Sequence, residues 1–144
     1  MSPFAPLVSA TLAALYTGHL VTTGLQARAW WRLPPGLRAR AAGSFHRFGP
    51  RLRAVLGGLA LGAAILQGLQ AGGAGWASLL LAASLTATLP VLGTEQRLVD
   101  LYREAAGVER DRDFIALQAR WDRWHSLQLT LAAGSLAALL LGGA

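Results

Sequence analysis

Two arginine-rich segments divide the chain into four apolar blocks, and this division restricts the folds that the chain can adopt. All thirteen basic residues are arginines, and they lie within residues 28–53 and 97–123. The apolar blocks cover about residues 4–27, 52–72, 76–93 and 124–142, and each is long enough to cross a bilayer as a helix. We therefore predict an all-α integral membrane protein, with one transmembrane four-helix bundle over residues 1–144.

The placement of the arginines predicts an orientation in the cell membrane. By the positive-inside rule, residues 28–51 and 94–123 are cytoplasmic loops and both termini lie outside. The net charge of +6 then faces the headgroups of the lipid bilayer and not nucleic acid, which would require arginines on a folded soluble surface. The first block follows no basic segment, so we interpret it as a retained span and not as a signal peptide. The chain has no cysteine, which excludes disulfides, thiolate metal ligands and cysteine nucleophiles.

The two arginine-rich segments are predicted to contain short helices. In the first, arginine and alanine alternate with apolar residues over Leu37–Phe48, which favours a short amphipathic helix in the interfacial headgroup layer. Gly49-Pro50 then turns the chain into the second span, and His46 is expected to be exposed. In the second segment, all seven acids are mixed with six arginines. This pattern indicates two short helices about Gly107, joined by surface ion pairs.

Polar side chains recur at helical spacing in the first span. Tyr16, His19, Thr23 and Gln26 follow one another at three- and four-residue steps in a helix that is otherwise rich in leucine, alanine and valine. A polar stripe is unfavourable against lipid, so we predict that these four side chains face the interior of the bundle.

The third span carries polar residues that share one face if the helix is regular. Ser84, Thr88 and Glu95 occupy positions i, i+4 and i+11. Pro90 and Gly93 lie between them and predict an interruption of the helix that would change this alignment. Glu95 comes at the cytoplasmic end of the span.

The last apolar block is preceded by the run Arg120-Trp121-Asp122-Arg123-Trp124-His125. Tryptophan and arginine at the foot of an apolar helix are typical of a membrane surface, because the indole ring is half apolar and arginine reaches the headgroups. At helical pitch, Gln118, Asp122 and His125 fall on one narrow face, at positions i, i+4 and i+7. His125 is therefore the leading candidate for a functional residue.

Two kinds of chemistry fit these residues. In the first, His125 is a general base that is oriented by Asp122 or Glu95 and takes a proton from an apolar substrate, while the hydroxyl groups of Tyr16 and Thr23 bind a developing oxyanion. In the second, His19, His125 and Glu95 bind iron, copper or zinc. No pair of these residues has a recognised metal-binding spacing, and the greater depth of His19 in the membrane argues against bis-histidine haem.

A role without catalysis also fits the sequence. His125 can serve as a hydrogen-bonding group between helices, Asp122 as a partner of Arg123, and the tryptophans as interfacial anchors. Gly58 and Gly62 form a strip of small residues that lets another helix approach closely, so a homodimer or an accessory subunit would use this strip. A transporter would require broken helices in pairs or an internal repeat, and neither is visible in the sequence.

Three stretches of the chain share a pattern with a known family: Thr17-Gly18-His19 to Gly24, Thr86 to Leu98, and above all Phe114 to Leu131, which contains Trp121-x-x-Trp124-His125-x-Leu127. In these stretches and in the order of its segments, the chain resembles the small four-helix membrane family that includes the anthrone oxygenases. This chain differs at Gly93-Thr94-Glu95-Gln96, where the family usually has an asparagine-rich turn, and at Gln128, where it usually has an arginine.

The resemblance implies the oxygenation of an electron-rich phenolic carbanion by O2, without an obligatory cofactor. It supports Trp124 and His125 as site residues. We therefore expect a membrane-embedded, cofactor-independent monooxygenase-like protein that acts on a small apolar or aromatic substrate in the cytoplasmic half of the bundle. The expected catalytic residues are His125, Asp122, Trp124 and Tyr16, and the expected substrate-binding residues are His19, Thr23 and Trp121.

Overall fold

The computed structural model describes residues 4–30, 32–71, 75–104 and 108–141, except for the side chains of residues 35, 36, 38–48, 71 and 102–112. These ranges are helical almost throughout and contain no strand. The helices are α1 (Phe4–Trp30), α2 (Pro35–Ala71), α3 (Trp76–Thr86), α4 (Thr88–Glu104) and α5 (Val108–Leu140).

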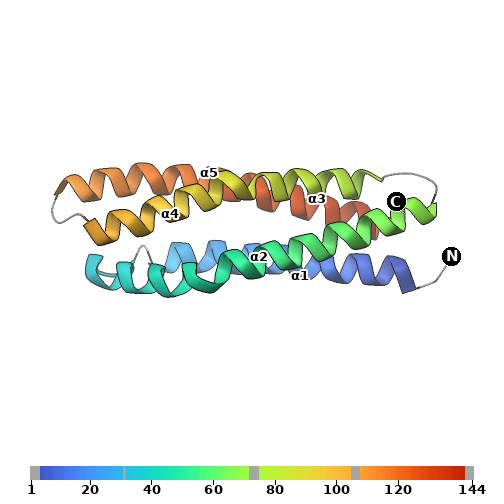
Figure 1. Ribbon diagram of the computed structural model, residues 1–144, viewed down its shortest axis with the longest axis horizontal. Coiled ribbons are helices and arrows are strands. Elements are labelled where there is room, and N and C mark those ends of the chain that lie inside the picture. The colour runs from blue at the N-terminus through green and yellow to red at the C-terminus, as the bar shows by residue number, and fades with distance from the viewer. Residues whose placement is uncertain (1–3, 31, 72–74, 105–107, 142–144) are drawn as a thin grey trace.

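The helices form a long bundle in which α3 and α4 follow one another as a single rod (Figure 1). α1 packs against α2 and α5, and the rod of α3 and α4 also packs against α2 and α5. α1 therefore lies diagonally across the bundle from the rod. The first residues of α1 and the last residues of α5 lie at one end of the bundle, and the end of α4 and the start of α5 lie at the other (Figure 1). The all-helical bundle of four rods confirms the coarse prediction from the sequence.

The prediction of a separate interfacial helix is wrong. Residues 37–48 form the first part of α2, which continues through Pro50 to Ala71. Proline removes only one backbone donor, and the neighbouring helices of a bundle can compensate for it, so the chain does not turn at this position. The side chain of His46 lies outside the described part of the structure.

The other predicted loop is also largely helical. α4 continues to Glu104 and α5 begins at Val108, so the helices extend well beyond the apolar blocks 76–93 and 124–142. Gly107, where we expected a break, lies outside the described residues. The apolar blocks predict only the part of each helix that could lie inside a membrane. The helices are longer, because their backbone hydrogen bonds continue into the charged segments.

The predicted interruption near Pro90 lies at Ala87. α3 ends at Thr86 and α4 begins at Thr88, so Pro90 falls in the first turn of α4, where its missing N–H requires no partner. The polar residues on both sides of this break still face the interior of the bundle. Ser84, Thr88 and Glu95 are all buried, at 0%, 5% and 3% exposure.

Buried side chains in α1 and α5 recur at alternating steps of four and three residues. This spacing is typical of helices that pack side by side along a bundle. It explains why only part of the predicted stripe on α1 is buried: Tyr16 and Thr23 lie on the buried seam, His19 is half-buried, and Gln26 is exposed. The seam residues are Ser9, Ala13, Tyr16, Leu20, Thr23 and Ala27 in α1, and Gln118, Trp121, His125, Gln128, Ala132, Ser135 and Leu139 in α5.

The distribution of polar and apolar side chains is the reverse of that in a water-soluble protein. Small and polar residues fill much of the interior, while many leucines are on the outside, among them Leu66 and Leu69 at 62% and 68% exposure. Such an exterior fits a lipid environment. Three segments are long and apolar enough to cross a membrane: Phe4–Trp30, Gly49–Gln70 and Trp76–Leu101. α5, which contains the fourth predicted span of residues 124–142, is not among them.

Gly57 lies where α2 packs against side chains of α1 and α3. A Cβ atom at this position would overlap the Leu85 side chain and lie 3.0 Å from Cε2 of Tyr16, whereas a Cβ atom on Gly58 would meet nothing within 4 Å. We expect Gly57→Ala to be less stable than Gly58→Ala by about 1–3 kcal/mol, because overpacking distorts the core and the gain in helix propensity cancels between the two variants. Thermal unfolding of both variants in detergent tests this. Equal midpoints would contradict the close approach at Gly57.

Candidate functional site

A buried ion pair between α2 and α4 lies at the centre of the candidate site. Nη2 of Arg53 is 2.9 Å from Oε1 of Glu95, and the side chains are 0% and 3% exposed. The indole Nε1–H of Trp121 donates a hydrogen bond of 3.0 Å to the same carboxylate oxygen. The carboxylate of Glu95 thus connects α2, α4 and α5.

Sequence reasoning missed Arg53. The arginine was grouped with the charged segment before the second span, although it lies seven residues before Ala60 and eleven before Ala64, on the buried face of α2. Heptad spacing from these alanines was the signal that could have identified it. Nε and Nη1 of Arg53 have no hydrogen-bond partner among the described residues.

His125 is held between α1 and Trp121. Its Nε2 is 3.0 Å from the backbone oxygen of Leu20, and its ring stacks on the indole of Trp121 with centroids 4.4 Å apart and 10° between the planes. A carbonyl oxygen can only accept, so the neutral imidazole carries its hydrogen on Nε2 and a lone pair on Nδ1. Nδ1 is buried and has no hydrogen-bond partner in the described part of the chain. A neutral imidazole with a lone pair on Nδ1 is the form that a general base requires.

His19 approaches the same region from α1. The imidazole lies close to the backbone of Gly49 in α2. Its Nε2 is buried without a hydrogen-bond partner in the described residues. Arg53 and Glu95 lie close enough to both His19 and His125 to act on them electrostatically. Both histidines therefore lie in the region of the bundle that holds the Arg53–Glu95 pair.

Asp122 is not the partner of the His125 ring. Its side chain is exposed and accepts a hydrogen bond of 3.2 Å from Nε2 of Gln118, one turn earlier in α5. Glu95 is linked to His125 through Trp121, which donates to the carboxylate and stacks on the imidazole. The predicted pair of His125 and Asp122 is replaced in the structure by a chain from Glu95 through Trp121 to His125.

Tyr16 belongs to a second polar cluster, deeper in the bundle. Nε2 of Gln128 donates to the hydroxyl oxygens of Tyr16, at 3.0 Å, and of Thr88, at 2.6 Å. The Tyr16 hydroxyl lies 3.1 Å from Oγ of Ser84, which itself donates to the backbone oxygen of Gln128 at 2.9 Å. These bonds connect α1, α3, α4 and α5, so the Tyr16 hydroxyl is fully occupied and does not face His125.

Two other expected site residues have defined positions. The hydroxyl of Thr23 donates to the backbone oxygen of His19 at 2.8 Å, which leaves it no free hydrogen for an oxyanion. Trp124 is partly buried and packs against the cluster of Ala27, Val91 and Trp121. Of the residues expected to bind substrate, only Trp121 lines the groove between α1 and α5.

That groove is the opening from which His125 can be approached. Its volume is about 260 Å³. A Cβ atom on Gly24 would lie 3.1 Å from Nε2 of His125, so glycine at this position lets the imidazole reach the α1 backbone. The groove is lined by Val21, Gly24, Leu25, Arg28, Trp121, Asp122, His125, Ser126 and Leu129.

The described residues form no ready-made set of metal ligands at this site. Among the described residues, no group of three or more histidine, aspartate or glutamate side chains is arranged to hold one. Glu95 is already paired with Arg53, and a metal cation beside a buried guanidinium would meet strong repulsion where the dielectric constant is low.

The site therefore combines a buried ion pair, a stacked tryptophan and histidine, and an apolar groove between two helices. The ion pair comes from α2 and α4, the stacked rings come from α5, and the groove lies between α1 and α5, so Trp121 of α5 connects the three parts. Comparison of the chain with models of protein families, with curated proteins and with solved structures finds no match.

Proposed function

We propose that the protein is a membrane-embedded, oxygenase-like enzyme that admits a small aromatic or apolar substrate through the groove between α1 and α5. The observation that carries this proposal is the state of His125. The ring lines the groove, its Nε2 lies 3.0 Å from the Leu20 carbonyl oxygen, and its Nδ1 is buried without a hydrogen-bond partner in the described residues, so a bound substrate would have to displace neighbouring side chains to reach that atom. The apolar lining by Val21, Leu25 and Leu129 suits a hydrophobic substrate.

The chemistry begins with removal of a proton from carbon. In a substrate of the anthrone type, a methylene group is made acidic by the adjoining aromatic and carbonyl groups, and Nδ1 of His125 accepts the proton. The carbanion then reduces O2 and forms a carbon–oxygen bond. The methylene carbon loses both hydrogens and becomes a carbonyl, one oxygen atom of O2 remains in the product, and the other leaves as water. The likeness of Phe114 to Leu131 to the anthrone oxygenases supports this reaction, which requires no cofactor.

Glu95 and Arg53 act as positioning residues in this proposal. The carboxylate fixes the Trp121 indole through its Nε1–H, and the indole face supports the imidazole of His125. Arg53 neutralises the carboxylate inside the bundle. The sequence suggested that either Asp122 or Glu95 orients His125. In this proposal Glu95 has that role, and it acts through the indole ring of Trp121.

The proposed setting is the cytoplasmic half of a membrane, with both termini outside. Three apolar segments long enough to span, an apolar exterior and the arginines at one end of the bundle support this placement. A substrate dissolved in the bilayer would reach the groove sideways, between α1 and α5, without passing through water.

The experiment that tests the groove compares two glycines of α1. Gly24→Ala adds a methyl group at 3.1 Å from His125, whereas Gly18→Ala adds one in open space. We expect Gly24→Ala to reduce anthrone-dependent O2 uptake by about 10²-fold, because a small displacement of a catalytic base has a large effect on rate. Gly18→Ala should retain wild-type uptake. Uptake that is equal in the two variants would contradict a reaction in this groove.

A second candidate is a non-enzymatic bundle that docks through α2. Ala54, Gly58 and Gly62 are exposed on one face, and nothing lies within 4 Å of a Cβ atom on either glycine. Such a face permits the close approach of a second helix, in a homodimer or with another membrane protein. In this case Gly58→Leu would separate the complex in detergent, and Gly24→Ala would have no effect on it.

A further inference from the structure

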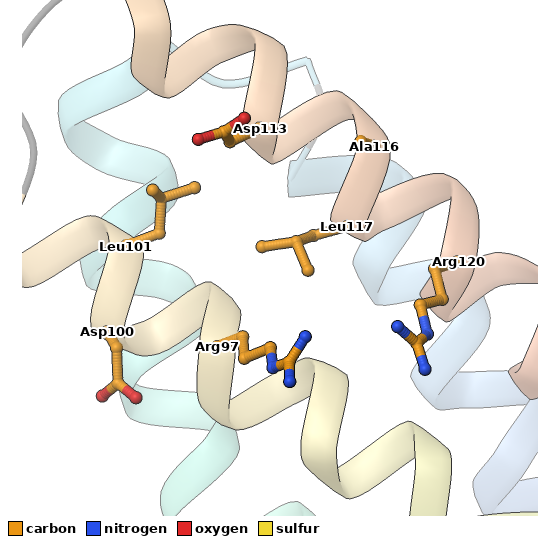
Figure 2. Close-up of a pocket in the computed structure, with 7 residues that line it drawn as sticks. All are labelled: Arg97, Asp100, Leu101, Asp113, Ala116, Leu117 and Arg120. Carbon is orange, nitrogen blue, oxygen red and sulfur yellow. The ribbon is translucent and has the colours of Figure 1, made fainter.

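A second site lies outside the groove of His125, between α4 and α5. Its volume is about 520 Å³, and it is lined by Arg97, Asp100 and Leu101 from α4 and by Asp113, Ala116, Leu117 and Arg120 from α5. The carboxylate of Asp100 accepts a hydrogen bond of 3.0 Å from Nε2 of Gln96. Figure 2 shows the guanidinium groups of Arg97 and Arg120 on facing sides of this cleft, and Asp113 towards its other end. Neither guanidinium has an ion pair with a side chain in the described ranges. Two cations that face one another across a cleft favour a bound anion.

Arg120 also lines another groove, which lies on the side of Arg120 that faces the apolar half of α5. This groove has a volume of about 450 Å³ and is lined by Arg120, Arg123, Trp124 and Leu127. Trp124 is partly buried, and Leu127 is 44% exposed. A tryptophan and a leucine beside arginine provide a surface for hydrocarbon next to a surface for phosphate.

The order of side chains along α5 matches the order of groups in a phospholipid. Leu127 and Trp124 lie at the apolar end, Arg120 follows about 10 Å from Leu127, and Asp113 lies about 10 Å further along the helix axis. The Arg120 side chain extends towards the Arg97 side of the cleft, and Asp113 lies on the preceding turns of α5 (Figure 2). In this order, the hydrocarbon chain of a lipid would contact Leu127 and Trp124, its phosphate would contact Arg120, and its cationic headgroup would contact Asp113.

We propose that the cleft between α4 and α5 binds a phospholipid with a primary ammonium headgroup, with its phosphate between Arg97 and Arg120. The ammonium group donates to the carboxylate of Asp113, and an acyl chain lies along Trp124 and Leu127. Asp113 selects the headgroup: it repels an additional negative charge, and a choline headgroup has no N–H to donate. This binding is separate from the proposed reaction at His125 and does not depend on it.

The test uses delipidated protein in detergent and native mass spectrometry with short-chain phospholipids of matched chain length. We expect phosphatidylethanolamine to bind at least about tenfold more tightly than phosphatidylcholine or phosphatidylglycerol, since it alone satisfies both the arginines and Asp113. Arg97→Gln and Arg120→Gln should each weaken binding by about tenfold or more, while Arg51→Gln, at an exposed position on α2, should not. Asp113→Asn should keep phospholipid binding and lose the preference for the ethanolamine headgroup.

A fluorescence experiment tests the proposed position of the acyl chain along Trp124. Phosphatidylethanolamine with brominated chains should quench part of the tryptophan fluorescence, and this part should be absent in Trp124→Phe. Inorganic phosphate and phosphoethanolamine serve as probes without chains. If either of them binds as tightly as the lipid, or if Arg97→Gln and Arg120→Gln bind the lipid like Arg51→Gln, the lipid site is refuted.

Discussion

Replacing Arg53 with leucine is expected to lower the free energy of unfolding by about 3–5 kcal/mol, because the Glu95 carboxylate would remain buried without its cation. Glu95 is only 3% exposed and cannot reach solvent without opening the bundle. The change would also release the carboxylate that fixes Trp121. Unfolding of the purified variant by denaturant in detergent, followed by circular dichroism, measures the loss.

Two variants make this result specific. Arg51→Leu removes an exposed arginine two residues away and should change stability by less than about 0.5 kcal/mol. Combining Arg53→Leu with Glu95→Leu removes the unbalanced charge, so the double variant should recover a large part of the stability lost in Arg53→Leu. If Arg53→Leu unfolds at the same denaturant concentration as wild type, the ion pair is not a buried element of the fold.

Replacing His125 with alanine is expected to reduce anthrone-dependent O2 uptake by about 10²–10⁴-fold, the usual contribution of a general base. The matched control is Asp122→Asn. Asp122 is exposed and hydrogen-bonds Gln118 within α5, so its replacement should leave uptake close to the wild-type rate. Uptake is recorded with an oxygen electrode on purified protein, and the slow oxidation of the substrate without protein is subtracted. Full activity in His125→Ala would contradict the proposed base.

Much of the fold follows from the apolar blocks alone. A block of 18 or more apolar residues must form its backbone hydrogen bonds internally, which makes a helix the expected structure, and connected helices of this length pack as a bundle. The helix ends could not be predicted in the same way. The chain around Pro50 and beyond Glu95 stays helical because packing against neighbours continues where the apolar pattern stops.

The candidate site was only partly predictable, because it depends on which residues of a helical turn face inwards. Gln118 and His125 were placed correctly on one face, but the residue between them on the buried seam is Trp121 and not Asp122. Trp121 and Asp122 are adjacent in the sequence, so their side chains point about 100° apart around the helix axis. The same shift separates the half-buried His19 from the buried Leu20 on α1. Arg53 was missed since a charged residue beside an arginine-rich segment resembles part of that segment until its partner Glu95 is known.

The most direct measurement of the central claim is proton exchange at the substrate carbon, without oxygen. An anthrone is incubated anaerobically in D2O with purified protein, and the incorporation of deuterium at the methylene carbon is followed by nuclear magnetic resonance. The proposed role of His125 predicts exchange faster than in buffer with wild-type protein and with Asp122→Asn, and exchange at the buffer rate with His125→Ala. Exchange at the wild-type rate in His125→Ala, or no acceleration by the wild-type protein, would contradict it.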